Sequence, residues 1–267
     1  MKTSPIGIFD SGIGGLTVAR QIVKLLPSES IIYLGDTARV PYGPRSKAVI
    51  TKFAKELTNF LIKCNVKCLV VACNTISATC LDEIRKVSPV PVFGVVEPTI
   101  ELAIKTTKTN KIGIIGTEGT IKSGTYVRKI HEINPKIEVD SAACPLFVPI
   151  AEEGLGAHKA TELIAKDYLR DLKKSQIDTL ILACTHYPLL SQVIQETMGA
   201  KVTLIDSAKP TAEKLKESLE ERKLLSDKKA KYEFYVTDAP DRVFKVASRF
   251  FGKILNDNLK QVTLPTS

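Results

Sequence analysis

The sequence predicts an α/β fold made of two similar α/β domains whose sheets are mainly parallel. Short β-branched runs alternate with amphipathic segments along almost the whole chain, which is the pattern of parallel sheets covered by helices. Each half also opens with a similar strand and glycine-rich turn, and each later ends a strand in a cysteine. We therefore expect the halves to be related by a pseudo-twofold axis, with a site in the cleft between them.

The predicted strands are short apolar runs rich in Val and Ile, which favour extended backbone. They cover residues 5–9, 30–34, 67–72, 91–95, 111–115, 136–141, 178–183, 201–205, 232–236 and 260–264. The intervening segments space their apolar residues three and four positions apart, which predicts helices with one buried face. Clear examples are residues 15–27, 45–63, 158–174 and 241–255.

Composition sets the class of protein. The chain has 267 residues, of which 44% are hydrophobic, enough for a large core. Its net charge is +9, but the basic residues are scattered among acidic ones, which favours solvated helix faces over a nucleic-acid surface. No apolar run approaches the roughly 18 residues of a membrane helix, and the first residues do not resemble a signal peptide. We expect a cytoplasmic protein without a nucleic-acid or membrane partner.

Cysteine usage agrees with a reducing compartment. The six cysteines are expected to be thiols and are Cys64, Cys68, Cys73, Cys80, Cys144 and Cys184. The chain has no C-x-x-C pair, and its three histidines lack the spacing of zinc ligands relative to these cysteines. No metal site is therefore expected.

An internal repeat singles out two of the cysteines. The segment "IGIFDSGIGGLTV" (6–18) resembles "IGIIGTEGTIKSG" (112–124). Cys73 follows the start of the first segment by 67 residues, and Cys184 follows the start of the second by 72. If the halves pack face to face, the two thiols should meet across the cleft at the carboxyl ends of the strands.

Two thiols on opposite sides of a carbon atom suit stereoinversion, because one removes a proton and the other delivers one to the opposite face. Both cysteines precede helices, whose positive ends favour the thiolate. His186 lies two residues after Cys184, and Asp10 and Asp36 end strands, so these three are candidates to relay protons. A redox enzyme would need adjacent cysteines. A cysteine hydrolase built on Cys184 and His186 would leave Cys73 unexplained.

The glycine-rich turn "DSGIGG" follows the first strand and raises the question of a bound phosphate. Its spacing matches neither nucleotide-binding glycine motif. The backbone donors at the start of a helix also bind carboxylates, so a carboxylate ligand is the better interpretation.

These residues closely resemble the glutamate racemases of the cofactor-independent aspartate/glutamate racemase superfamily. The segments "DSGIGGL" and "DTARVPYG" distinguish that family from the aspartate racemases, the hydantoin racemases and the related decarboxylase, which share only the cysteine pattern. The matching segments follow the family's order, at residues 7–18, 33–46, 70–78, 93–98, 112–121, 144–154, 182–190 and 204–208.

The resemblance implies interconversion of L- and D-glutamate without a cofactor or metal, supplying D-glutamate for peptidoglycan. It implies that Cys73 serves the D-enantiomer and Cys184 the L-enantiomer. Asp10 and His186 would assist them. Further polar contributors would be Asp36 and Glu152, with Glu153 as the alternative to Glu152. The implied substrate-binding residues are Asp10, Ser11, Tyr42, Gly43, Asn74, Thr75, Thr117, Thr120, Thr185 and His186.

The resemblance also implies the domain organisation. Residues 1–97 with 208–267 would form one domain and residues 98–207 the other, and a homodimer would be the expected assembly. Several alternatives stay open. Thr117 and Thr120 could be turn and helix-capping residues. The protein could also be a racemase for aspartate or another acidic amino acid, or a non-catalytic binding protein for an anionic amino acid.

Overall fold

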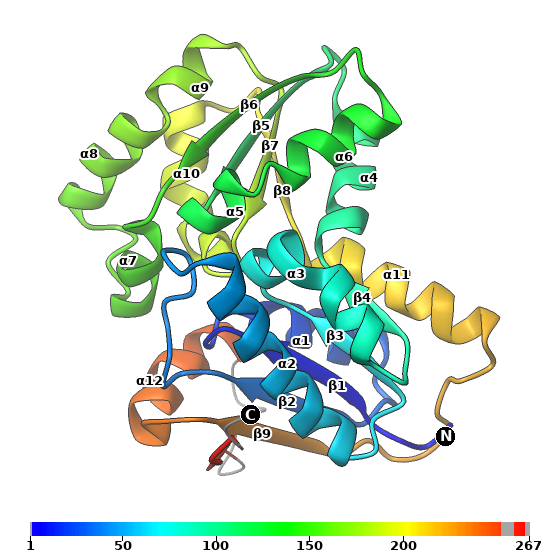
Figure 1. The fold of residues 1–267 in the computed structure, drawn as a ribbon. Helices are drawn as coiled ribbons and strands as arrows, with labels where there is room; N and C mark the ends of the chain where they lie inside the picture. The colour runs from blue at the N-terminus through cyan, green and yellow to red at the C-terminus, as the bar shows by residue number, and fades with distance from the viewer. Residues whose placement is uncertain (1, 252–258, 265–267) are drawn as a thin grey trace.

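Two parallel β-sheets form the centre of the protein in a computed structural model that describes residues 2–251 and 259–264 (Figure 1). The first sheet has the order β10-β9-β2-β1-β3-β4. Its strands are β1 (Ile6–Asp10), β2 (Ile31–Gly35), β3 (Cys68–Val71), β4 (Val92–Gly94), β9 (Tyr232–Val236) and β10 (Leu259–Gln261). All pairings in it are parallel. The predicted α/β class with parallel sheets is thus confirmed.

The second sheet repeats the design of the first. Its strands are β5 (Lys111–Gly116), β6 (Glu138–Ala143), β7 (Thr179–Ala183) and β8 (Thr203–Asp206), all parallel. Their order, β6-β5-β7-β8, matches the order β2-β1-β3-β4 in the first sheet strand for strand. The weak sequence repeat therefore corresponds to a repeated four-strand topology.

Helices cover both sheets. They are α1 (Leu16–Leu25), α2 (Lys47–Lys63), α3 (Asn74–Val87), α4 (Val96–Thr106), α5 (Glu118–Lys122), α6 (Thr125–Ile133), α7 (Phe147–Glu153), α8 (Lys159–Tyr168), α9 (Arg170–Lys174), the 3-10 helix η1 (Tyr187–Leu190), α10 (Ser191–Met198), α11 (Ala208–Glu221) and α12 (Pro240–Phe251). None of the helices in the described ranges is long and apolar enough to cross a membrane.

The first sheet is buried on both faces, and the residues of β1 show why. Ile6 and Ile8 point to the face covered by α1 and α11, whereas Phe9 joins the cluster formed with α2 and α3. Alternate residues of a strand face opposite sides of a sheet, so a strand apolar at every position needs helices on both. The second sheet is covered in the same way by two further clusters.

Several elements connect the two sheets. Helix α4 leads from β4 into the second sheet and contacts β7, β8 and α6. Helix α11 leads back and contacts both α1 and α4. The chain then adds β9 beside β2 and β10 beside β9. The domain boundaries near residues 97 and 208 stay a prediction.

Two predicted helices differ from the structure in detail. The segment 158–174 is split at Leu169, whose backbone angles (φ −97°, ψ 1°) are not helical. The two parts have different partners, because α8 packs against α10 and α9 against β6. Residues 252–255 of the predicted helix 241–255 lie outside the described residues.

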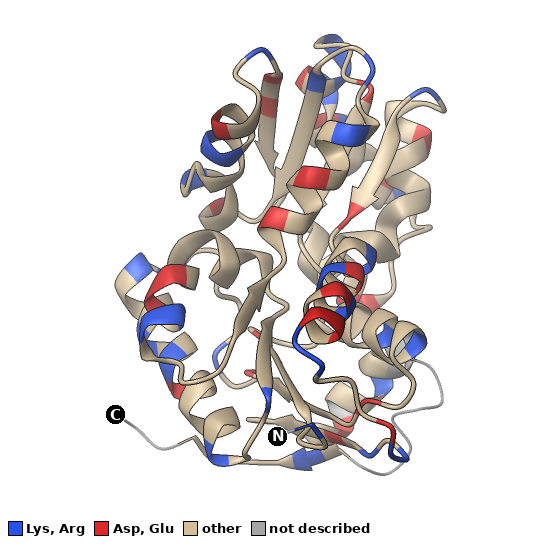
Figure 2. Cartoon of the chain, turned by 90° about the vertical axis from the view of Figure 1, so that its right-hand side faces the viewer, with Lys and Arg blue, Asp and Glu red and all other residues tan. Residues whose placement is uncertain are grey.

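Charged residues of both signs are interspersed along the surface helices (Figure 2). Many form pairs three or four residues apart on one helix, such as Lys209 with Glu213 and Lys216 with Glu220 on α11. Exposed pairs of this kind contribute little to stability, but they keep the helix faces soluble.

Candidate active site

A small cavity of about 30 Å³ lies between the two sheets, and both cysteines of the repeat line it. Three of the segments that line it follow the carboxyl ends of β1, β3 and β7. The lining residues are Ser11, Val40, Pro41, Tyr42, Gly43, Cys73, Asn74, Thr75, Thr117, Val148, Cys184, Thr185 and His186. Most of the residues predicted to bind substrate are therefore brought together.

Cys73 is the residue that precedes helix α3, just beyond the end of β3. Its side chain is buried, and its Sγ donates a hydrogen bond to Ser11 Oγ at 3.3 Å. Burial and the nearby carboxylate of Asp10 raise the pKa of the Cys73 thiol to about 12. At neutral pH this residue is therefore a protonated thiol, ready to donate a proton.

Cys184 lies in a different electrostatic environment. Its Sγ is 3.9 Å from His186 Nδ1, and His186 Nε2 is 3.1 Å from Glu152 Oε1. Burial disfavours charge on the imidazole, but the hydrogen bonds with Cys184 and Glu152 outweigh it and raise the pKa of His186 to about 10. Thus Cys73 lies beside the carboxylate of Asp10, whereas Cys184 lies beside a histidine that is positively charged at neutral pH.

Asp10 is completely buried at the end of β1. Its Oδ2 accepts a hydrogen bond from the backbone N–H of Gly12 at 3.0 Å. Burial raises the pKa of Asp10, and the charge of His186 opposes that rise. Asp10 does not line the cavity, but its charge acts on both Cys73 and His186.

The glycine-rich turn brings the two halves into direct contact. A Cβ atom on Gly14 would lie 2.3 Å from Thr185 Oγ1 and 2.6 Å from His186 Nδ1. On Gly15 it would lie 2.6 Å from the Cβ of Asp10. Only glycine allows approaches this close, since Cβ contacts below 3.0 Å essentially never occur. The turn therefore packs directly against His186 and fixes its position.

Asp36 lies behind the cavity wall and does not line the cavity. Its carboxylate accepts hydrogen bonds from the hydroxyl of Tyr42, from Arg39 Nε at 2.6 Å and from Thr237 Oγ1 at 2.8 Å. Tyr42 is almost fully buried and does line the cavity, after a cis peptide bond between Val40 and Pro41. The geometry therefore makes Asp36 the support of Tyr42.

Three threonine hydroxyls form a cluster at one side of the cavity. Thr75 Oγ1 lies 2.9 Å from Thr117 Oγ1 and 3.2 Å from Thr120 Oγ1, and the last two are 3.0 Å apart. Thr117 also caps helix α5 by accepting the N–H of Thr120. The capping interpretation is therefore correct for Thr117, which lines the cavity as well, while Thr120 lies behind it.

Sequence reasoning missed five residues at or near the site. Val40, Pro41 and Val148 line the cavity, and Tyr126 and Ser207 hydrogen bond the side chain of Asn74. Apolar wall residues carry no chemical signature in a sequence. Ser207 lies in the matching segment 204–208 and Tyr126 in none of the matching segments, and it is tertiary packing that brings both to Asn74.

The structure also distinguishes two adjacent acids. Glu152 contacts His186, whereas Glu153 is exposed. All six cysteines are free thiols. Within residues 2–251 and 259–264, no group of three His, Cys, Asp or Glu side chains is arranged to hold a metal ion.

Comparison with known proteins places this site in a family. The sequence model of the Asp/Glu/hydantoin racemase family matches residues 6–215. A glutamate racemase from Geobacter metallireducens is 47% identical, with 99% of this chain and 98% of that protein covered. The crystal structure of a glutamate racemase isoform from Bacillus anthracis superposes with a TM-score of 0.96 at 42% identity, covering both chains fully.

A second solved structure is almost as similar. Glutamate racemase from Francisella tularensis, solved in complex with D-glutamate, has a TM-score of 0.94 at 41% identity and also covers both chains fully. Aspartate racemase from Picrophilus torridus, at 18% identity and a TM-score of 0.57, shares the fold alone. The chain belongs to the Asp/Glu/hydantoin racemase family and, within it, groups with the glutamate racemases.

Proposed function

We propose that this protein interconverts L- and D-glutamate by moving protons at the α-carbon between two thiols, without a cofactor. One observation supports this most: Cys73 and Cys184 come from equivalent strands of the two sheets and line one buried cavity. The racemases from Geobacter metallireducens and Bacillus anthracis, similar over nearly their whole length, carry the name of this reaction. D-Glutamate made in this way would enter peptidoglycan, and we place the enzyme in the cytoplasm.

In the L-to-D direction, Cys184 as thiolate takes the α-proton, so the C–H bond breaks and an S–H bond forms. Cys73 then donates its thiol proton to the opposite face, leaving a thiolate at Cys73. The arrangement suits this direction, because Cys73 is held as a thiol and the positively charged imidazole of His186 lies beside Cys184. The reverse reaction starts from the opposite protonation state.

The substrate must enter a site that is nearly closed. A cavity of about 30 Å³ has room for one or two waters. Glutamate, with ten non-hydrogen atoms, needs several times that volume. Because the lining is shared between the two halves, we propose that they separate to admit glutamate and close again to exclude water. A water-poor site strengthens the electrostatic stabilisation of the carbanion that forms next to the carboxylate.

The polar groups of the lining match two carboxylates and an ammonium group. Ser11, Asn74, Thr75, Thr117 and Thr185 offer hydroxyl and amide donors, and Gly43 offers backbone. The remaining predicted residues would act through these. Asp10 would act through Cys73, and Glu152 would act through His186. Asp36 would act through Tyr42, and Thr120 through Thr75 and Thr117.

The first experiment follows L-glutamate in D2O with purified protein and no added cofactor. Optical rotation should fall while deuterium enters the α-position of the D-product. A panel of acidic amino acids run in parallel tests the substrate. Exchange with aspartate and none with glutamate would overturn the choice of substrate. Glutamate binding without exchange would identify a binding protein. Size-exclusion chromatography with light scattering tests the proposed homodimer.

Two single variants test the division of labour between the thiols. Cys73→Ser and Cys184→Ser should each lower racemisation by orders of magnitude, because a serine hydroxyl is a far weaker acid and base at this pH. Cys73→Ser keeps the base for the L-enantiomer, so any residual deuterium exchange should be confined to L-glutamate. Cys184→Ser should show the mirror pattern. Near-normal turnover in either variant would rule out a two-thiol reaction.

A further inference from the structure

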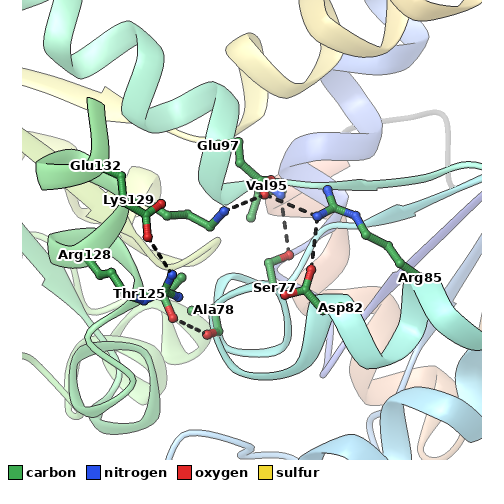
Figure 3. A network of polar contacts seen from close by, with 10 residues as sticks. All are labelled: Ser77, Ala78, Asp82, Arg85, Val95, Glu97, Thr125, Arg128, Lys129 and Glu132. Atoms are coloured by element: carbon green, nitrogen blue, oxygen red, sulfur yellow. Dashed lines mark hydrogen bonds and ion pairs between the residues drawn. The ribbon is translucent and has the colours of Figure 1, made fainter. Parts of the chain in front are cut away.

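Helix α6 of the second half docks on a kink in helix α3 of the first. Cys80 interrupts α3 with non-helical backbone angles (φ −148°, ψ 26°). Next to this kink, the carbonyl of Ala78 accepts a buried hydrogen bond from Thr125 Oγ1 at 2.6 Å. One turn further along α6, Lys129 pairs with Glu97 at 3.0 Å (Figure 3). The start of α6 is therefore fixed against the helix that begins just after Cys73.

Tyr126, which follows Thr125 in α6, contacts Asn74, the residue next to Cys73. Tyr126 is buried, and its hydroxyl donates a hydrogen bond to Asn74 Oδ1 at 2.6 Å. The other end of the same amide, Asn74 Nδ2, donates to Ser207 Oγ at 3.2 Å. Asn74 is the only one of these three that lines the cavity. Its side chain is thus held from two sides by residues that do not line it.

In this arrangement the amide keeps an N–H, rather than its oxygen, for a ligand. The Asn74 oxygen accepts from Tyr126, and one of the two N–H groups is used by Ser207. The side chain of Asn74 makes no further hydrogen bond to the described residues, and Asn74 lines the cavity. An amide held in this way presents a donor, which suits a carboxylate and disfavours an ammonium group.

We propose that Tyr126 is a positioning residue for the reaction: it fixes the Asn74 amide so that Nδ2 donates a hydrogen bond to a carboxylate of the bound amino acid. The inference rests on the proposed function, since it concerns the same site. Without the Tyr126 hydroxyl the amide can turn its oxygen toward the cavity. That oxygen would repel the carboxylate in part of the population and weaken substrate binding.

The test is the variant Tyr126→Phe, which keeps the ring and removes one hydroxyl. We expect KM to rise roughly tenfold for both enantiomers, as loss of one hydrogen bond implies, while kcat stays within about twofold. Tyr232→Phe is the matched control, because it also removes one tyrosine hydroxyl but lies on β9, outside the cavity lining. Its kinetic constants should equal those of the unmodified protein.

A double-mutant cycle separates positioning from a general structural effect. If Tyr126 acts through Asn74, adding Tyr126→Phe to Asn74→Ala should change kcat/KM no further. An additional loss in the double variant, or an unchanged KM in Tyr126→Phe, would overturn the inference. Should Tyr126→Phe fail to fold, Ser207→Ala releases the other end of the amide, and the same rise in KM is expected. No turnover in the unmodified protein would instead contradict the proposed function.

Discussion

Gly14 offers the sharpest test of how the site is assembled, because a single methyl group placed there must displace the acid–base machinery. The substitution Gly14→Ala adds a Cβ that would lie 2.3 Å from Thr185 Oγ1, 2.6 Å from His186 Nδ1 and 2.7 Å from His186 Cε1. No positive φ is recorded at this residue, so the backbone itself accepts alanine. Any effect must therefore come from the contacts.

The size of the displacement follows from these distances. Ordinary van der Waals contact begins at 3.4 Å, so Thr185 Oγ1 must move by 1.1 Å and His186 Nδ1 by 0.8 Å. His186 contacts Cys184 at 3.9 Å and Glu152 at 3.1 Å, so moving the ring changes both contacts. Misplacement of a catalytic group by about 1 Å can cost about 100-fold in rate, so we expect kcat/KM to fall by about that factor in both directions.

The assay is steady-state racemisation from each enantiomer, with thermal unfolding measured alongside. Gly12→Ala is the matched control in the same turn, because its Cβ would come no closer than 3.4 Å to any neighbour. We expect that variant to keep kcat/KM within about twofold, as an ordinary contact demands. If Gly14→Ala is as active as Gly12→Ala, the claim that the turn holds His186 in position is wrong.

Two further predictions concern stability. The hydrogen bonds with Cys184 and Glu152 raise the pKa of His186 above its ordinary 6.5 to about 10, so these interactions stabilise the fold fully below pH 6.5 and the contribution is lost as the pH rises through 10. In urea titrations, the gap in unfolding free energy between the unmodified protein and Glu152→Gln should therefore shrink from pH 6.5 to pH 10; a constant gap would contradict the pairing. Lys67→Met should lower the unfolding free energy by about 3–5 kcal/mol, because it leaves the carboxylate of Glu29 buried without its cation. The same titration checks this, with Lys2→Met, in an exposed pair, as the control, and kcat should not change because Lys67 precedes β3 at the end of the sheet away from the cavity.

The sequence was sufficient for the elements whose signal is local. Each predicted strand overlaps an observed one. For a strand such as β3 the reason is that a run that is apolar at every position has few places to be buried other than a parallel sheet. The repeat that links residues 6–18 to 112–124 predicted two halves of similar design, and the matching order of four strands in the two sheets agrees with it. The break at Leu169 in the predicted helix 158–174 depended on partners that the segment itself does not specify.

The residues of the site also differ in whether a local sequence pattern could reveal them. Cys73 and Cys184 were recognisable because two like motifs needed a joint explanation. The difference between them was not, since it comes from His186 and Glu152 on one side and from Asp10 and burial on the other. Asp36, which supports Tyr42, accepts a hydrogen bond from Thr237, and these two residues lie 201 positions apart in the sequence. No local pattern carries information over that distance.

The return of the chain to its first sheet has a consequence for synthesis. The four strands of the second sheet lie between residues 111 and 206 and need nothing further downstream to pair. Strand β2 is apolar and fully buried, yet its outer neighbour β9 is translated roughly two hundred residues later. Until then "IIYLG" is an uncovered sheet edge of the kind that invites pairing with other chains. A chain that stops before residue 232 would therefore contain both Cys73 and Cys184 and still be prone to aggregate. We expect only full-length chains to give active protein.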